Sequence, residues 1–424
     1  MPGQRIHHDD LMCSPELRTS LYASYRIDGE LDVNGFIVAL SQAVKSHEVL
    51  RIGVSQEPGR DPRQWLREEP GGGSLISCRN VQSASEEQFN RYARAVLAKD
   101  LSDSWDLGSQ YPFRYRLLRY SPTVHAFLAT FSHVALDGRG RSLVLQSLWQ
   151  NLAGGERHTS PVSESSAAGF MDSALRHAEI SLAGGARTSE FWLSRLRQKL
   201  PPVRFSADLL TEPASRECAT ERVLVQGERL ERIRSLSRLK GCSEFQWVVA
   251  AFADTVFEVV PQDRVAIMIP VDTRLASEQN VSGMFTVPLP LFIERTESLD
   301  QSIRQARREI LSVIARRNVS STILDGIREA LSSADSADAP GFSVTYVNGQ
   351  WNQSEWHCGD VVAQEGAYRP RVSLHSTGMD LRAVSGDDSL ELTLTLDVKI
   401  SSPDAVCRVI AFLESRIDGS IPGR

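Results

Sequence analysis

The chain has 424 residues, of which 41% are hydrophobic and 24% are charged, and it carries 53 acidic against 47 basic side chains. These proportions are typical of globular proteins and argue against a disordered or fibrous class, while the length indicates two domains of about 200 residues each. The net charge of −6 argues against broad binding of nucleic acid, because such binding requires a basic surface.

The cysteines and the first residues bear on metal binding and location. The six cysteines are scattered without a C-x-x-C pair or a paired Cys/His spacing, so neither a zinc site nor a disulfide framework is expected. We interpret the adjacent His7 and His8 as solvated residues, and we expect no metal site. Residues 1–10 are polar and no run of about 18 apolar residues occurs, so we expect no signal peptide, no membrane contact and a cytoplasmic location.

The first half of the chain alternates predicted strands and helices. Strands are expected at 21–27, 49–54, 112–120 and 124–131, and helices at 31–44, 85–101 and 140–153. The turn residues Ser121-Pro122-Thr123 predict a hairpin between the last two strands. Gly, Ser, Thr and Pro residues between 153 and 167 indicate a surface loop, so we expect the first domain to end near residue 175.

The second half has the same mixed character. Helical stretches are expected within 170–200 and at 227–241, 244–260, 299–317 and 404–415, and strands at 222–225, 265–271, 342–348 and 390–396. The basic helix at 299–317 is interpreted as a solvated face, with a docking surface for an acidic partner as the alternative. We therefore predict an α/β (α+β) fold with two domains, residues 1–175 and residues 176–424.

The stretch from Val124 to Gly138 carries the chemistry, because a buried strand ends there in His-x-x-x-Asp-Gly. A histidine at the end of such a strand is partly desolvated, which favours the neutral imidazole and makes His133 a candidate general base. Asp137 follows the strand end and is expected to pair with a cation elsewhere, an arginine being able to fix the loop that aims the histidine. Gly138 either leaves room for a substrate arm or supplies a turn dihedral.

Several stretches together resemble the superfamily of condensation domains and chloramphenicol-acetyltransferase-like acyltransferases. Residues 46–51 look like its HExLR stretch, and residues 132–138 match its HHxxxDG motif except at the first position. Residues 269–274, followed by residues 283–286, look like its PVxxR and GxFxN segments. The order and spacing of these motifs make the resemblance fairly specific, and it extends over most of the chain.

In that superfamily two such subdomains form a pseudo-dimer arranged as a V, with a central tunnel along the seam. The resemblance implies that His133 is the catalytic histidine, which deprotonates or orients an amine or hydroxyl as this group attacks an acyl thioester. It implies that Asp137 is structural and paired with Arg274, in the bridging segment around 270–290. Gly138 would flank the tunnel through which a pantetheine arm arrives from a carrier protein or coenzyme A.

The resemblance also supplies further tunnel or substrate-binding residues. These are Gly283, Phe285, Thr286, Tyr346, Asn348, Ser373 and His375. We interpret His375 as a structural residue rather than a second base. The sequence departs from the family pattern at Thr286-Val287, where valine-asparagine is usual, and at Ser132, where a first histidine is usual. Strand alternation turns Ser132 away from His133, so we expect Ser132 to support the loop.

The predicted function is acyl transfer or condensation in natural-product biosynthesis, joining an acyl thioester to an amine or hydroxyl acceptor. We expect a monomer with no permanently bound cofactor, and a phosphopantetheine thioester on a carrier protein, or coenzyme A, as donor. The alternative is a catalytically silent condensation-like module that recruits a carrier protein or partner enzyme, which Ser132 favours and the intact His133 opposes. A serine hydrolase is disfavoured because no Gly-x-Ser-x-Gly elbow is present.

Overall fold

The chain forms two compact units in a computed structural model, and neither unit is a single continuous stretch. The structure describes residues 1–2, 4–5, 20–55, 62–71, 75–154, 169–182, 185–198, 203–209, 219–331, 341–349, 354–369, 378–397 and 402–419. The first unit comprises Met1–Leu182, Thr273–Thr286 and Asn352–Val372. The second comprises Ala183–Asp272, Val287–Trp351 and Ser373–Arg424. The predicted division at residues 175 and 176 differs from this one, because Thr273–Thr286 and Asn352–Val372 return to the first unit.

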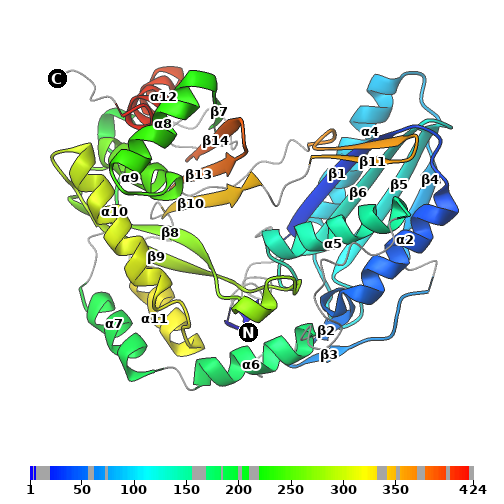
Figure 1. Cartoon of the computed structure of the whole chain (residues 1–424), viewed down its shortest axis with the longest axis horizontal. Helices are drawn as coiled ribbons and strands as arrows, with labels where there is room; N and C mark the ends of the chain where they lie inside the picture. Colours follow the sequence, from blue (N-terminus) through cyan, green and yellow to red (C-terminus); the bar gives the residue numbers. More distant parts are fainter. Residues whose placement is uncertain are drawn as a thin grey trace. The chain divides into compact units, whose positions relative to one another are not determined.

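The first unit is built on a mixed sheet with the strand order β11-β12-β1-β6-β5-β4 (Figure 1). The strands are β1 (Ser20–Asp28), β4 (Ser77–Asn80), β5 (Phe113–Ser121), β6 (Val124–Ser132), β11 (Glu355–Cys358) and β12 (Val361–Glu365). Strand β6 pairs antiparallel with β1 and β5, and β12 pairs antiparallel with the outer side of β1. The late segment that carries β11 and β12 thus completes a sheet begun by the first residues of the unit.

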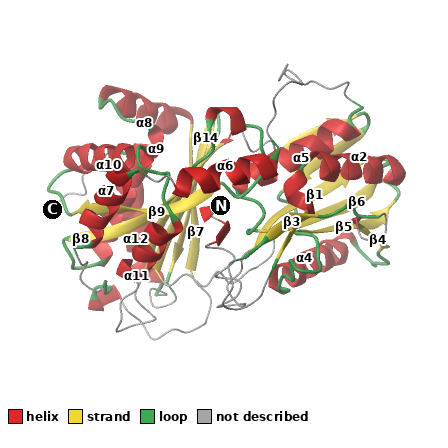
Figure 2. Cartoon of the chain, turned by 90° about the horizontal axis from the view of Figure 1, so that it is seen from below, coloured by secondary structure: helices red, strands yellow, loops and turns green. Residues whose placement is uncertain are grey.

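Helices cover both faces of this sheet (Figure 2). The helices are α2 (Val33–Ser46), α4 (Glu86–Ser102), α5 (Gly138–Leu152) and α6 (Phe170–Leu182), together with the turn η1 (Glu48–Arg51) and the short pair β2 (Ile52–Val54) and β3 (Gln64–Leu66). On one face, Phe127 of β6 packs with Phe36 of α2 and Trp149 of α5. On the other, Leu128 packs with residues of α4. Every residue of β6 after Val124 is buried, which confirms the predicted two-sided strand.

The expected strand at 49–54 is partly wrong. Residues 48–51 form η1, and only Ile52–Val54 are extended. The reason is local: the backbone N–H of Leu50 turns back to the carbonyl of His47 at 2.9 Å, so the chain tightens at the end of α2 before it extends. Val49 and Leu50 are buried by this turn, and their apolar character therefore gives the same sequence pattern as a strand.

The second unit is built on a sheet with the strand order β7-β14-β13-β10-β8-β9. The strands are β7 (Ala219–Gln226), β8 (Arg264–Asp272), β9 (Thr286–Glu294), β10 (Gly341–Asn348), β13 (Gly378–Ser385) and β14 (Ser389–Leu396). The helices are α7 (Ala186–Leu196), α8 (Gly227–Leu239), α9 (Glu244–Val259), α10 (Leu299–Ile314), α11 (Ser321–Leu331) and α12 (Pro403–Ile417), with the turn η2 (Ala207–Leu209). Helix α9 is the most buried of these, and a complete capping box at Ser243 begins it. The turn η3 (Ala276–Glu278) belongs to the first unit.

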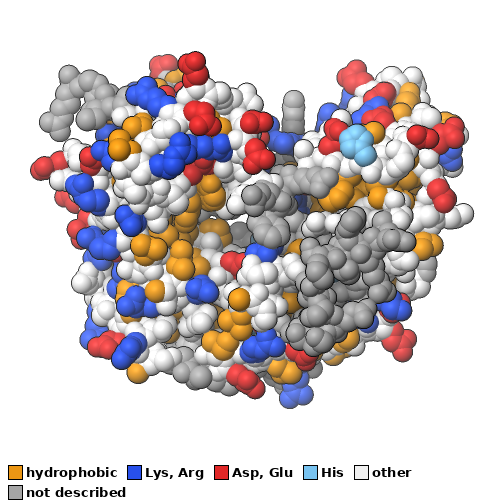
Figure 3. Space-filling view, viewed as in Figure 1, with side chains coloured by type: hydrophobic (Ala, Val, Ile, Leu, Met, Phe, Trp, Pro, Cys, Tyr) orange, Lys and Arg blue, Asp and Glu red, His pale blue; other side chains and the backbone are white. Residues whose placement is uncertain are grey.

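Acidic and basic side chains are interspersed over the molecular face drawn in Figure 3. The basic helix predicted at 299–317 is α10, and it ends at Ile314. Arg304, Arg307 and Arg308 are exposed on it. Its buried apolar residues are Leu299, Ile303, Ala306, Ile310 and Val313, while Leu311 and Ile314 are exposed.

No helix in the described ranges is long and apolar enough to cross a membrane. Those ranges also contain no group of three or more His, Cys, Asp or Glu side chains arranged to hold a metal ion.

The packing around Phe127 predicts a large effect of truncating that side chain. Phe127 is fully buried, with the rings of Phe36 and Tyr115 at centroid distances of 5.1 and 5.8 Å. Phe127→Ala should lower the free energy of unfolding by about 3–5 kcal/mol, measured by urea denaturation. Val38→Ala, at an exposed position of α2, should change it by less than about 0.5 kcal/mol. A loss below about 1 kcal/mol for Phe127→Ala would contradict this core.

Candidate active site

The candidate base His133 lies in the turn that joins β6 to α5. The strand ends at Ser132, and the backbone N–H groups of Ala135 and Leu136 both donate to the Ser132 carbonyl, at 3.0 and 3.3 Å. His133 is half-buried at this junction. Burial lowers the pKa of its imidazole, and this effect outweighs the opposing hydrogen bonds of the ring to the backbone of His133 and Leu136 and the opposing charge of Asp137. The imidazole is therefore neutral at neutral pH.

Ser132 is fully buried and forms part of the same turn. Its hydroxyl oxygen accepts a hydrogen bond from the backbone N–H of Val134 at 3.4 Å, and its own backbone N–H donates to the Pro112 carbonyl at 3.0 Å. The serine that stands in place of the motif's first histidine is therefore a small residue that braces the turn.

Asp137 begins α5 and is the most heavily hydrogen-bonded residue of the loop. It is the N-cap, and its Oδ1 accepts from the backbone N–H of Gly140 at 2.7 Å. Its Oδ2 accepts from the backbone N–H of Phe285 and from the hydroxyl of Thr286, each at 3.1 Å. The carboxylate thus joins the start of α5 to the segment that contains residues 273–286.

Arg274 supplies the cation expected for Asp137. Its Nη1 donates to Oδ2 at 2.8 Å and its Nη2 to Oδ1 at 2.9 Å, a bidentate pair in which both side chains are almost completely buried. Burial alone would raise the pKa of Asp137, but the charge and hydrogen bonds of Arg274, with those of nearby backbone N–H groups, hold it below its usual value. The carboxylate is consequently ionised across the physiological range.

The same arginine fixes the backbone around it. Its Nε donates to the Val281 carbonyl at 3.1 Å, and its Nη2 also reaches the Gly283 carbonyl at 3.2 Å. The Gly283 carbonyl in turn accepts from the backbone N–H of Asp137 at 3.1 Å. The guanidinium lies 4.3 Å from the centre of the Phe285 ring, a cation–π contact. Segment 281–285 and the loop after β6 are therefore held as one polar unit.

The predicted site glycines Gly138 and Gly283, together with Gly140 of α5, have different roles in the geometry. A Cβ on Gly140 would lie 2.9 Å from the backbone nitrogen and oxygen of Gly283, and a Cβ on Gly283 would overlap the rings of Phe285 and Phe170. These two glycines permit close contact between α5 and the 281–285 segment. A Cβ on Gly138 would meet no atom within 4 Å, and Gly138 does not have a positive φ. Open space, rather than a turn dihedral, is thus the feature found at Gly138.

The other predicted site residues lie in different parts of the chain: two support the loop that contains Asp137, two lie in the second unit, and two lie outside the described residues. Phe285 is buried and Thr286 donates to Asp137, so both support the loop through Asp137 and Arg274. Tyr346 and Asn348 belong to β10 of the second unit, where the Tyr346 hydroxyl donates to Oε1 of Glu244 at 2.9 Å. Burial, followed by the Glu244 charge among the causes that raise it, brings the pKa of Tyr346 to about 12. Ser373 and His375 lie outside the described residues.

Segment 273–286 makes further polar contacts, through Glu278 and Ser282, that the sequence did not predict. Glu278 is fully buried, its Oε2 lies 2.8 Å from His177 Nε2, and its Oε1 accepts from Arg176 at 3.0 Å. At the other end of the segment, Ser282 Oγ lies 2.8 Å from His47 Nδ1. His47 and Glu48 lie in the stretch that resembles the HExLR motif, but residue types alone do not reveal such long-range partners.

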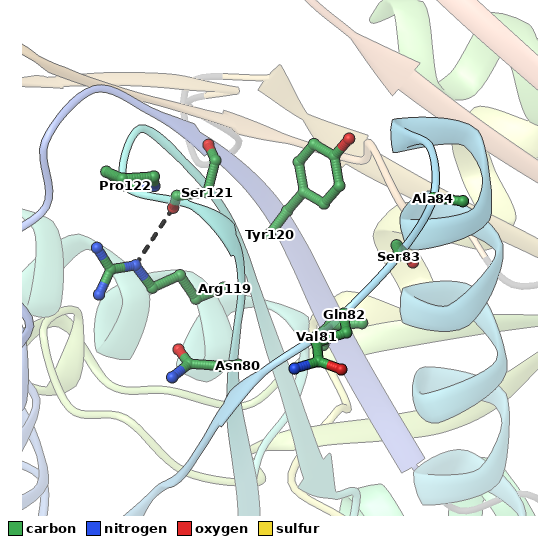
Figure 4. Close-up of a pocket in the computed structure, with 9 residues that line it drawn as sticks. All are labelled: Asn80, Val81, Gln82, Ser83, Ala84, Arg119, Tyr120, Ser121 and Pro122. Carbon is green, nitrogen blue, oxygen red and sulfur yellow. Dashed lines mark hydrogen bonds between the residues drawn. The ribbon is translucent and has the colours of Figure 1, made fainter.

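An open pocket lies elsewhere on the first unit, next to the β5–β6 hairpin (Figure 4). Its volume is about 600 Å³, and it is lined by residues 80–84 and 119–122. Arg119 and Asn80 extend on one side of it, and Arg119 Nε donates to the Ser121 carbonyl at 3.3 Å. These residues precede β6 and His133 follows it, a separation of about 30 Å along the strand. This pocket is therefore not part of the candidate active site.

Comparison with known proteins identifies the family to which the chain belongs. The family model described as Condensation domain matches residues 19–357. A linear gramicidin synthase protein of Brevibacillus parabrevis is 24% identical over 408 residues, which cover 93% of this chain and 8% of that protein. An isonitrile lipopeptide synthase of Streptomyces coeruleorubidus is 25% identical over 320 residues, which cover 73% of this chain and 20% of that protein. The chain thus spans a small part of the length of these relatives.

Solved structures agree on the fold. A variant of the starter condensation domain of rhizomide synthetase RzmA, in complex with C8-CoA, superimposes with a TM-score of 0.74 at 17% identity, covering 99% of this chain and 94% of that one. The X-domain of teicoplanin biosynthesis, in complex with OxyB, superimposes with a TM-score of 0.75 at 16% identity, covering 98% and 92%. The chain belongs to the condensation-domain family of nonribosomal peptide synthesis, and it has that family's fold of two chloramphenicol-acetyltransferase-like subdomains.

Proposed function

We propose that this chain joins an acyl thioester to an amine or hydroxyl acceptor, with His133 as the base or orienting group. The observation that carries the proposal is the half-buried position of His133, directly before a loop anchored by the Asp137–Arg274 pair, where burial lowers the pKa of the imidazole. Condensation domains act with carrier proteins, and a structural neighbour binds C8-CoA. The donor here is accordingly a phosphopantetheine thioester on a carrier protein or a coenzyme A thioester.

The chemistry is an acyl transfer in which His133 handles one proton. The acceptor nitrogen or oxygen attacks the thioester carbonyl carbon, and its proton moves to the neutral imidazole as the new bond forms. The carbon–sulfur bond then breaks, and the proton on the imidazolium neutralises the departing thiolate. The ionised Asp137 stays paired with Arg274 throughout, so its role is to hold the loop rather than to exchange protons.

A second function is favoured by Ser132. In this alternative the chain is a catalytically silent condensation-like module that recruits a carrier protein or partner enzyme, as the X-domain neighbour binds OxyB. The buried serine at the motif's first position supports it. The intact loop, with Asp137 and Arg274 fully bonded, supports catalysis instead, because a silent module has no need for a fixed orientation of His133. Docking of an acidic partner on α10 and a monomeric state remain predictions.

The first test is product formation by mass spectrometry, offering acyl-carrier and acyl-coenzyme A donors with a panel of amines and alcohols. His133→Ala should lower the rate of product formation by about two or more orders of magnitude, because a positioned general base contributes about that factor. His357→Ala, at an exposed histidine of β11, should leave the rate unchanged.

A product formed equally well by the His133→Ala protein would exclude the role of this histidine. If no donor yields a product while a carrier protein binds with micromolar affinity, the recruitment module is the correct function. Far-UV circular dichroism of each variant establishes that the fold is retained in these comparisons.

The lowered pKa of His133 predicts the pH dependence of the reaction. Only the neutral imidazole accepts a proton, so the rate is full above the pKa of His133 and falls as the pH decreases through it. The acidic limb of the kcat/KM profile should therefore have its midpoint below about 6.5, the usual histidine value. An alcohol acceptor should be used, because its own ionisation does not contribute in this range. A midpoint at or above about 6.5 would contradict a desolvated base.

A further inference from the structure

His47 is a half-buried histidine that has no role in the proposed chemistry. It is the C-cap of α2, where the chain turns into η1. Its Nδ1 lies 2.8 Å from Ser282 Oγ, and its Nε2 is buried without a hydrogen-bond partner among the described residues. Burial lowers its pKa to about 4, so the ring is neutral at neutral pH. Among the described residues, the hydrogen bond that the ring makes is therefore the one at Nδ1.

Ser282 lies in the part of the chain that fixes the candidate active site. Its neighbour Gly283 accepts hydrogen bonds at its carbonyl from the Asp137 backbone N–H at 3.1 Å and from Arg274 at 3.2 Å. Its other neighbour, Val281, accepts from Arg274 Nε at 3.1 Å. Ser282 itself is almost fully buried. The bond from His47 thus acts on the one residue between two carbonyls that the arginine already holds.

A short hydrogen-bonded path therefore leads from the end of α2 to the loop that carries His133. It runs from the His47 ring to the Ser282 hydroxyl, along the peptide to the Gly283 carbonyl, and from there to the Asp137 N–H. A neutral ring is suited to this position, because it bonds to a hydroxyl as donor or acceptor without placing a second cation near Arg274.

We propose that His47 is a positioning residue, which sets the loop of Asp137 and His133 by holding Ser282 through its Nδ1. The proposal deepens the proposed function and rests on it where activity is concerned. In this proposal the ring positions the loop through Nδ1 and not through Nε2. An asparagine places its amide group on Cγ, as histidine places Nδ1, and therefore retains the bond to Ser282, whereas glutamine places its amide one carbon further away.

The test compares His47→Asn, His47→Gln and Ser282→Ala by two independent measurements. The first is hydrogen exchange at the Asp137 amide, which needs no substrate, and the second is kcat and KM for product formation. We expect the Gln and Ala variants to exchange about tenfold faster and to lose kcat about tenfold with little change in KM, a factor that matches one net hydrogen bond. His47→Asn should retain most of the protection and most of kcat.

Ser46→Ala is the matched control, because the Ser46 hydroxyl is exposed and donates to the Gln42 carbonyl of its own helix. Unchanged Asp137 exchange in both His47→Gln and Ser282→Ala would overturn the proposal, as would an Asn variant as impaired as the Gln variant. If the unaltered protein makes no product, the proposed function fails, while the exchange measurement still decides whether His47 positions the loop.

Discussion

The buried pair of Asp137 and Arg274 is the interaction on which the site depends. Removing both charges from water is costly, and attraction between them compensates only when the remaining donors and acceptors are also satisfied. Here both carboxylate oxygens and the guanidinium are engaged, the carboxylate by Gly140, Phe285 and Thr286 and the guanidinium by backbone carbonyls. The pair is thus a geometric constraint that has one good arrangement, and it joins the segment 273–286 to the start of α5.

Everything that gives His133 its properties follows from this constraint and from β6. The strand is buried on both faces and brings the histidine to the edge of an apolar core, which lowers its pKa. The loop after the strand is held by Asp137 at its end and by Ser132 at its start. The result is a neutral imidazole on a fixed turn beside Gly138, where a Cβ would meet no atom within 4 Å. Such an arrangement is suited to taking a proton from a bound acceptor.

Much of this arrangement is readable from the sequence. Alternation and burial in residues 124–131 predict the strand, and the family motifs predict both the histidine and the pairing of Asp137 with Arg274. The features that the sequence could not predict are those that depend on contacts between distant segments or on a pattern shared by two structures. The pairing of β12 with β1 depends on segments more than 300 residues apart, and the turn at Val49 has the same apolar residues as a strand. The bond of His47 to Ser282 is invisible for the same reason: a histidine at a helix end gives no indication of its partner.

The central claim is that the Asp137–Arg274 pair acts on catalysis through His133. A double-mutant cycle in kcat/KM tests it directly, with Arg274→Lys, which keeps the charge but loses the bidentate geometry, and His133→Ala. The account predicts that Arg274→Lys lowers kcat/KM by about tenfold or more when His133 is present and has little effect when His133 is absent. Equal, multiplicative losses in both backgrounds would contradict it, because the pair would then act independently of the histidine.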